Sequence, residues 1–206
     1  NFVVTDDLAL SASDFNSFSV PAPVDPRLPN GGGYEIGGFY NVVPARFGVP
    51  ADNYVTLSDE YGRQIRHWNG VDVNLRLRSR AGMFLQGGTS TGRTSTDNCQ
   101  VIAKVPEIGP LGAPYCRQDT RWLTQVKFLG AYSIPRIGVQ VSGTFQSLPG
   151  PEILATYNAP FAAYGPSLGR VISGGNLNST VAIGLLAPGT RYGDRLNQLD
   201  VRVGKI

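Results

Sequence analysis

The chain has 206 residues, of which 41% are hydrophobic and 16% are charged, and this composition excludes a disordered or strongly charged protein. Its 26 glycines and 15 prolines lie well above the usual share of about 12% for the pair, which disfavours long helices and favours an all-β fold. The formal net charge of +3 is small and dispersed, so we expect no nucleic-acid partner.

The first predicted strand covers residues 1–10, and a Gly/Pro-rich segment without clear periodicity follows over residues 11–61. The clearest strand covers residues 67–78, because apolar and polar side chains alternate along it. One face carries Val71, Val73, Leu75 and Leu77, and the other carries Asp72, Asn74, Arg76 and Arg78. This alternation predicts a strand with one apolar and one polar face.

A short turn over residues 79–82 leads into a second extended segment, residues 83–96, and together these predict a hairpin. Met83 and Leu85 share one face of the second segment. The opposite face carries Gln86, Gly88 and Ser90.

Both cysteines of the chain, Cys99 and Cys116, lie in the long segment 93–121. The Pro/Gly-rich stretch between them can bring their α-carbons to bridging distance, so we expect a disulfide. A disulfide implies an oxidising compartment, whereas the alternative is two free thiols in a cytosolic protein.

A second hairpin is predicted from residues 122–134, the turn 135–138 and residues 139–147. In its first strand the apolar Val126 and Phe128 alternate with Gln125 and Lys127, although Leu123 and Leu129 interrupt the polar face. In its second strand the two faces alternate strictly, with Val139, Val141 and Phe145 opposed to Gln140, Ser142, Thr144 and Gln146.

The last predicted strand, residues 196–206, follows the long segment 148–195. It alternates Leu199, Val201 and Val203 with Asp200, Arg202 and Gly204. The connections between the six predicted strands therefore run long, short, long, short, long. In an up-and-down sheet this order gathers all short turns at one end.

Short turns at one end and long loops at the other are typical of outer-membrane β-barrels. No run of about 18 apolar residues is present, so a transmembrane helix is excluded. The fold predicted from these patterns is all-β: an antiparallel, up-and-down transmembrane β-barrel segment of about six strands. Four aromatic residues near predicted strand ends suit a membrane interface: Trp68, Trp122, Tyr132 and Phe145.

In the barrel interpretation one face of the strands contacts lipid and the other faces a water-filled lumen. The candidates for contact with lipid are Val71, Val73, Leu75, Leu77, Val126, Phe128, Val139, Val141 and Phe145. The candidates for the lumen are Asp72, Asn74, Arg76, Arg78, Gln125, Lys127, Gln140, Ser142, Thr144, Gln146, Asp200 and Arg202.

The runs "HWNGVDVNLRLRSRAGMFLQGGTSTGRTSTDNC", "YCRQDTRWLTQVKFLGAYSIPRIGVQVSGTFQSLPGPE" and "RLNQLDVRVGKI" resemble the C-terminal barrel of TonB-dependent outer-membrane receptors. The likeness is greatest to the large Oar-like members with a carboxypeptidase-regulatory-like N-terminal domain. It extends to "PAPVDPRLPNGGGY" in the first long segment. The family's plug, energy-coupling box and terminal aromatic strand are absent from these residues.

The resemblance implies binding and uptake of an unidentified extracellular substrate at the bacterial cell outer membrane. Residues 1–206 would be part of one barrel domain that closes with about 22 strands, so we expect a fragment of a longer protein. The implied partners are outer-membrane lipid, the remainder of the barrel, an N-terminal plug and TonB acting through that plug. The expected disulfide would then pin an extracellular loop.

We expect no enzyme, cofactor or metal site. The chain has one histidine, His67, and two cysteines, too few for a zinc finger or a multi-histidine site, and it contains no G-x-S-x-G motif. The alternative function is a secreted β-sandwich module that binds a carbohydrate or protein and carries one disulfide. In a sandwich the apolar faces would meet each other across two stacked sheets.

Overall fold

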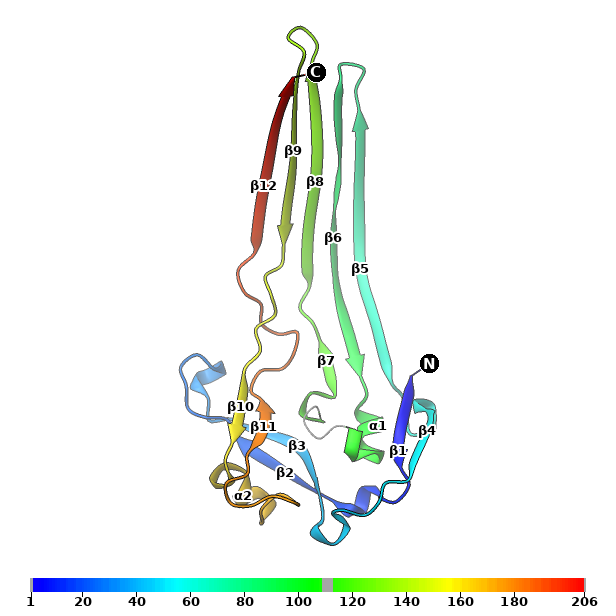
Figure 1. Ribbon diagram of the computed structural model, residues 1–206, viewed down its shortest axis with the longest axis vertical. Coiled ribbons are helices and arrows are strands. Elements are labelled where there is room, and N and C mark those ends of the chain that lie inside the picture. Colours follow the sequence, from blue (N-terminus) through cyan, green and yellow to red (C-terminus); the bar gives the residue numbers. More distant parts are fainter. Residues whose placement is uncertain (1, 109–112, 206) are drawn as a thin grey trace. The chain divides into compact units, whose positions relative to one another are not determined.

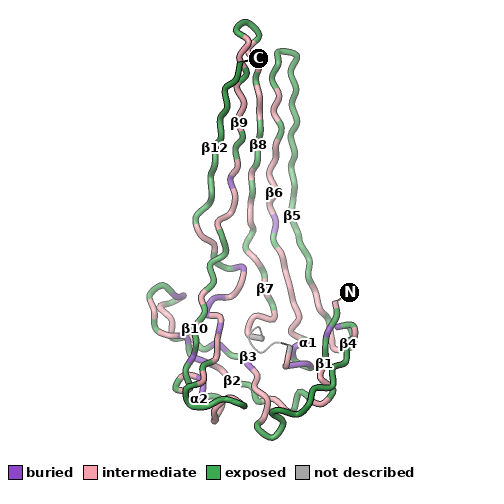
Figure 2. Tube along the Cα trace, viewed as in Figure 1, coloured by how far each residue is buried: buried purple, intermediate pink, exposed green. Residues whose placement is uncertain are grey.

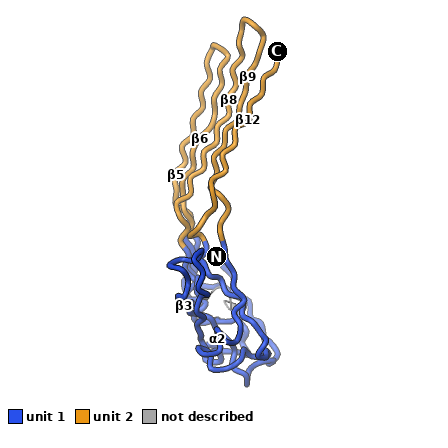
Figure 3. Tube along the Cα trace, turned by 90° about the vertical axis from the view of Figure 1, so that its left-hand side faces the viewer, with its two compact units in different colours: residues 1–67, 95–118, 154–188 blue, residues 68–94, 119–153, 189–206 orange. Residues whose placement is uncertain are grey.

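The computed structural model describes residues 2–108 and 113–205, which form mainly antiparallel β-structure. They divide into two compact units, each built from three segments of the chain (Figure 3). The sheet unit comprises residues 68–94, 119–153 and 189–206, and the loop unit comprises residues 1–67, 95–118 and 154–188. The assignment of both units to one barrel domain stays a prediction.

One antiparallel sheet of long strands, in the order β12-β9-β8-β6-β5, forms the sheet unit (Figure 1). These strands are β5 (Ile65–Arg78), β6 (Met83–Asp97), β8 (Leu123–Ile134), β9 (Val139–Leu148) and β12 (Leu196–Lys205). The short β7 (Arg117–Asp119) also pairs with β6. Neighbouring long strands are consecutive along the chain, so the predicted antiparallel, up-and-down order is confirmed for these five.

The first predicted strand lies elsewhere. It forms the short β1 (Val3–Asp7), which pairs with β4 (Asn53–Leu57) in a two-stranded sheet of the loop unit. The prediction that residues 1–10 join the same meander was therefore wrong. The physical reason is that Val4 of β1 is buried against Val101 and Val105 in a separate small core.

The register of the long sheet keeps the predicted faces aligned from strand to strand. Gly88 of β6, Lys127, Gln146 and Gln198 lie opposite one another in one row. The next row contains Gly87, Phe128, Phe145 and Leu199. Directly opposite residues of an antiparallel pair point to the same face. The polar and apolar residues of the long strands therefore form two continuous faces.

The loop unit contains two further small sheets and all eight of the described helices. Strand β2 (Phe15–Pro21) pairs with β3 (Glu35–Val42), and β10 (Thr156–Ala159) pairs with β11 (Val181–Gly184). The helices are η1 (Ala12–Asp14), η2 (Pro29–Gly31), η3 (Pro44–Arg46), η4 (Ser58–Glu60), α1 (Cys99–Lys104), η5 (Pro106–Ile108), η6 (Ala113–Tyr115) and α2 (Phe161–Leu168). None of the described helices has the length and apolar character needed to cross a bilayer.

The loop unit has its own hydrophobic core, which the sequence did not reveal. Phe18 of β2, Phe39 of β3 and Tyr164 of α2 are buried together, with ring centroids 5.4 Å apart for Phe18–Phe39 and 6.3 Å apart for Phe18–Tyr164. Ile183 of β11 belongs to the same cluster. Buried positions gather in these elements, whereas the long strands contain few of them: β5 and β12 are exposed, and β6, β8 and β9 are mostly half-buried (Figure 2). The long connecting segments are therefore folded together rather than independent loops.

Arg170, just after α2, joins distant segments of the loop unit through hydrogen bonds. Its guanidinium donates to Asn41 Oδ1 (2.6 Å), to the Val42 carbonyl (3.0 Å) and to Asn16 Oδ1 (3.1 Å). Partial burial lowers the pKa of Arg170. These bonds tie the segment after α2 to β2 and β3.

The disulfide predicted between Cys99 and Cys116 is present, with the two α-carbons 4.8 Å apart. It closes the segment that contains α1, whose Val101 is fully buried beside Val4. A bridge across a 17-residue separation restricts the unfolded chain.

The Cys99→Ser/Cys116→Ser variant should lose about 3 kcal/mol of loop-unit stability, because the unfolded chain regains the entropy that the bridge removes. Denaturant unfolding of the oxidised protein and the variant measures this loss. Adding reductant should shift the midpoint of the oxidised protein and leave the variant unchanged. Equal midpoints for oxidised protein and variant would contradict the prediction.

Candidate functional site

The polar side chains of the long strands share one side of the sheet, which we call the polar face. Strand register and alternation assign to it the following residues: Asp72, Asn74, Arg76 and Arg78 of β5; Gln86, Gly88 and Ser90 of β6; Gln125 and Lys127 of β8; Gln140, Ser142, Thr144 and Gln146 of β9; and Gln198, Asp200 and Arg202 of β12. Every residue predicted to face a lumen is therefore on this side. That this polar face lines a lumen stays a prediction.

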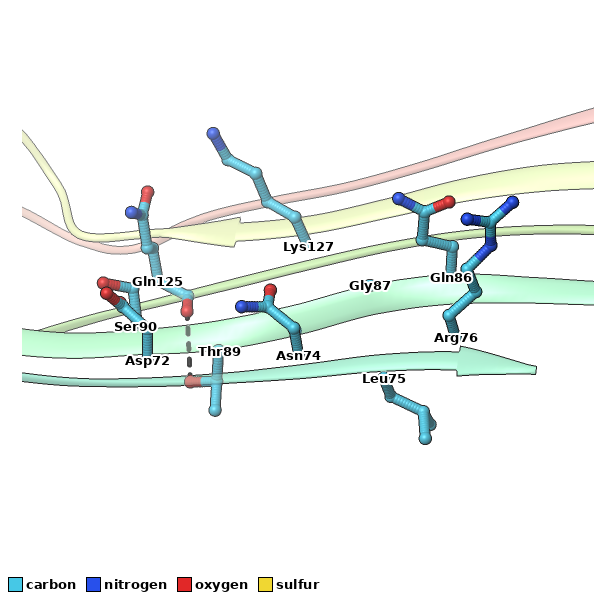
Figure 4. Close-up of a pocket in the computed structure, with 11 residues that line it drawn as sticks. Asp72, Asn74, Leu75, Arg76, Gln86, Gly87, Thr89, Ser90, Gln125 and Lys127 are labelled. Carbon is cyan, nitrogen blue, oxygen red and sulfur yellow. Dashed lines mark hydrogen bonds between the residues drawn. The ribbon is translucent and has the colours of Figure 1, made fainter.

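A hollow of about 540 Å³ lies on the polar face between β5, β6 and β8. Figure 4 shows that Asp72, Asn74 and Arg76 of β5 project to the same side as Lys127 of β8, while Leu75 projects to the opposite side. The lining side chains that project into it carry one carboxylate, two cations, several amides and a hydroxyl. A surface of this chemistry suits a polar or zwitterionic partner, and it offers little to an apolar ligand.

Gly88 lines this hollow, and the neighbouring strand leaves room only for glycine there. A side chain at Gly88 would collide with the Val73 backbone carbonyl and begin 2.7 Å from Asn74 Oδ1, closer than a real Cβ approaches a neighbour. Any other residue would therefore force both the β5 backbone and the Asn74 side chain to shift. The sequence offered only the weak signal of a glycine within an extended run.

Hydrogen bonds fix the side chains of the polar face on β9 and β12. Gln146 Nε2 donates to Gln198 Oε1 (2.7 Å), and Gln198 Nε2 donates to Asp200 Oδ2 (2.9 Å). The Thr144 hydroxyl also donates to Asp200 Oδ2 (3.4 Å). Gln198 was missed as a candidate, although it shares the alternation of Asp200 and Arg202.

Trp68 differs from its predicted place at a membrane interface. Its indole lies over Gly70 and Gly92 on the polar face, where it lines a hollow of about 280 Å³ together with Ser90 and Gln125. A side chain at Gly92 would begin 2.7 Å from the indole nitrogen, so glycine is required beneath the ring. The indole contributes an aromatic surface to the polar face.

Two other aromatic residues of the predicted interface, Tyr132 and Phe145, lie on the opposite side. Tyr132 pairs with Met83 near the turns, whereas Phe145 pairs with Phe128 in the middle of the strands. Phe145 is three residues from the end of β9, and its place at a membrane interface stays a prediction. The Trp122 ring lies 5.6 Å from the Arg93 guanidinium carbon, and the two form a cation–π pair.

The opposite side of the sheet, which we call the apolar face, carries all nine residues predicted to contact lipid. Its members are Val71, Val73, Leu75 and Leu77 of β5, Val126 and Phe128 of β8, Val139, Val141 and Phe145 of β9, and Leu199, Val201 and Val203 of β12. On the edge strands the side chains are strongly exposed, with 65% for Val71 and 68% for Leu199. The described residues of the sheet unit form one layer, so no second sheet within that unit covers this face. Contact with lipid stays a prediction.

Comparisons with protein-family models, curated proteins and solved structures find no match. Among the described residues, no group of three or more His, Cys, Asp or Glu side chains is arranged to hold a metal ion. The function is therefore inferred from the two faces of the sheet and from the resemblance of the sequence.

The loop unit carries a cluster of acidic groups beside the disulfide-closed segment. Glu107 Oε1 accepts a hydrogen bond from the Asp7 backbone N–H (3.1 Å), and the Tyr61 hydroxyl donates to Asp6 Oδ2 (2.5 Å). Burial, with a smaller contribution from Asp6, raises the pKa of Glu107. The bond to Asp6 raises the pKa of Tyr61 to about 12.

Because the pKa of Glu107 is raised by folding, the folded state binds more protons than the unfolded state between the two pKa values. The contribution of Glu107 to stability should therefore increase as the pH falls through the raised pKa, and it should be lost as the pH rises through it. The Glu107→Gln variant should be at least as stable as the wild type at neutral pH and lose this advantage in acid. Denaturant midpoints measured from neutral to acidic pH, with Glu60→Gln as control, test the direction of this stability change. A wild type that loses stability relative to Glu107→Gln in acid would contradict the prediction.

Proposed function

We propose that the chain forms part of the wall and the extracellular loops of an outer-membrane β-barrel, in a TonB-dependent receptor that binds and takes up a substrate. The observation that carries this proposal is the pair of faces on the long sheet. One face is apolar, with strongly exposed side chains on the edge strands, and the other carries charged, amide and hydroxyl side chains. A barrel wall between lipid and a water-filled lumen needs this distribution.

Strand length also supports a membrane wall, whereas the sheet edges place a requirement on it. The long strands have 10 to 15 residues, and a tilted strand crosses a bilayer with about 9–11. Within the described residues, no strand pairs with the outer edges of β5 and β12. Open edges are not tolerated in lipid, so the proposal requires further strands of the same barrel at both edges.

The remaining parts of the proposal follow from the order of connections. The short turns 79–82 and 135–138 would face the periplasm, and the long segments of the loop unit would be extracellular. The polar face would line the lumen, where an N-terminal plug opened by TonB would sit. No chemical step is assigned to these residues, because the proposed role is binding and passage.

Folding the chain in plain buffer and in detergent micelles tests the proposal. Far-ultraviolet circular dichroism should show the long-sheet β-structure in micelles and not in buffer, because the apolar face needs a cover. Heat-modifiable gel mobility in micelles provides a second readout. A soluble monomer whose long sheet forms and melts cooperatively in plain buffer would contradict the barrel and favour the secreted sandwich module.

A further inference from the structure

The charges of the sheet unit are distributed unevenly along its strands. We call the part nearest the short turns the turn end; it comprises residues 77–85, 130–143 and 201–205, which lie beyond the row that contains Gln86, Leu129, Thr144 and Asp200. It contains five cationic side chains and no carboxylate: Arg78, Arg80, Arg136, Arg202 and Lys205. The rest of the sheet unit contains six cations and five carboxylates. The positive charge of the unit is therefore concentrated at one end.

Three of these cations occupy the extreme end rather than the polar face. Arg80 and Arg136 lie in the two short turns, and Lys205 pairs with Val139 on the apolar side of the sheet. All three are exposed. The hairpin turns and the end of β12 lie together in the view of Figure 1. The ion pairs found between described residues, Arg27–Asp25 and Arg46–Asp14, both belong to the loop unit.

Apolar and aromatic side chains adjoin these cations. Tyr132 and Met83 lie opposite each other on the apolar face and are 42% and 44% exposed. Ile137, beside Arg136 in the turn, is 61% exposed. An amphipathic tyrosine between an apolar face and a band of cations fits the boundary between acyl chains and headgroups.

We propose that the turn end docks against the phosphate headgroups of anionic phospholipid, through Arg80, Arg136 and Lys205. This inference rests on the proposed function, which places the apolar face in the bilayer. It adds to that function that the end of the sheet with the short turns prefers anionic phospholipid to neutral phospholipid. The choice of partner rests on charge complementarity: the turn end carries cations and contains no carboxylate that could repel a phosphate group.

Vesicle partitioning of the full 206-residue chain tests this inference. The chain is folded into phosphatidylcholine vesicles with and without phosphatidylglycerol, and bound protein is separated by flotation. The wild type should favour the anionic vesicles, and added salt should weaken the preference. Each cation near an anionic surface raises the partition coefficient about fivefold. The partition coefficient into anionic vesicles should therefore fall by up to about 100-fold in the triple variant Arg80→Gln/Arg136→Gln/Lys205→Gln.

The matched control removes three cations from elsewhere in the sheet unit: Lys127→Gln/Arg121→Gln/Arg191→Gln. It should keep most of the preference, and circular dichroism in micelles should show that both variants keep the β-structure of the wild type. An equal loss in the control, or equal binding of the wild type to both vesicles, would overturn the inference while leaving the barrel intact. Competition by inorganic phosphate at constant ionic strength would overturn the headgroup assignment. Failure to enter either vesicle would contradict the barrel as well.

Discussion

Lysine at both Leu75 and Leu199 should prevent stable insertion of the sheet into a bilayer. Leu199 lies in the middle row of the apolar face with Phe128 and Phe145, and Leu75 lies on the same face of the other edge strand. A lysine near the bilayer midplane of a barrel strand destabilises insertion by about 2–4 kcal/mol. The two sites are on opposite edges of the sheet, so their effects should add to about 4–8 kcal/mol.

The neighbouring residues provide a control that adds the same charge to the same strands. Asn74→Lys/Gln198→Lys places both lysines on the polar face, where water solvates them and Asp72 and Asp200 lie nearby. Urea titration of the chain refolded in lipid vesicles should show a large loss for the Leu75/Leu199 variant and a small change for the control. Equal losses would show that lipid does not cover the apolar face.

The Phe39→Ala substitution should unfold much of the loop unit by removing a fully buried ring. Phe39 is 0% exposed, packs 5.4 Å from Phe18 between ring centroids, and belongs to the cluster that contains Tyr164 and Ile183. Truncating a buried phenylalanine costs about 3–5 kcal/mol, because apolar contacts are lost and a cavity is left. Amide hydrogen exchange in β3 should accelerate by about a hundredfold or more.

Leu177→Ala is the control for this prediction, because Leu177 is 67% exposed and its truncation leaves no cavity. Exchange in β3 should be nearly unchanged in that variant. The long strands should keep their circular dichroism in both variants if the loop unit has a separate core. Unaltered exchange in β3 of Phe39→Ala would contradict the description of this core.

The long strands were predictable because each one carries its own signal. Val71 to Leu77 alternate with Asp72 to Arg78 inside a single segment, so no distant residue is needed to recognise the strand or its faces. The pairing of the strands depends on the turns. The short turns 79–82 and 135–138 join neighbouring strands and fix their register, which aligns Phe128 with Phe145.

The loop unit could not be predicted, because its core is assembled from segments far apart in the sequence. Phe18 and Tyr164 make ring contact across more than a hundred residues, and the strands around them have only four to eight residues. Such short strands show no reliable periodicity. The same reason explains the wrong placement of residues 1–10, whose partner strand β4 lies in a segment that the sequence presents as irregular.

Most residues of the polar face were predicted, with Gln198 missed, but the hollows on this face were not. Alternation indicates which side chains share a face, whereas a hollow depends on missing side chains in neighbouring strands. Gly88 beside Asn74, and Gly92 beneath Trp68, become meaningful only once the strands are paired. Trp68 was assigned to a membrane interface because a tryptophan near a strand end is common there.

Spin labels along β9, in micelles or lipid vesicles, test the two-faced wall most directly. Single cysteines at residues 139–146 would be labelled while Cys99 and Cys116 remain paired in their disulfide. Labels at 140, 142, 144 and 146 should be accessible to a water-soluble relaxation agent, and those at 139, 141, 143 and 145 to oxygen dissolved in lipid. Water accessibility at every position, or odd positions shielded from both agents, would contradict a wall between lipid and lumen.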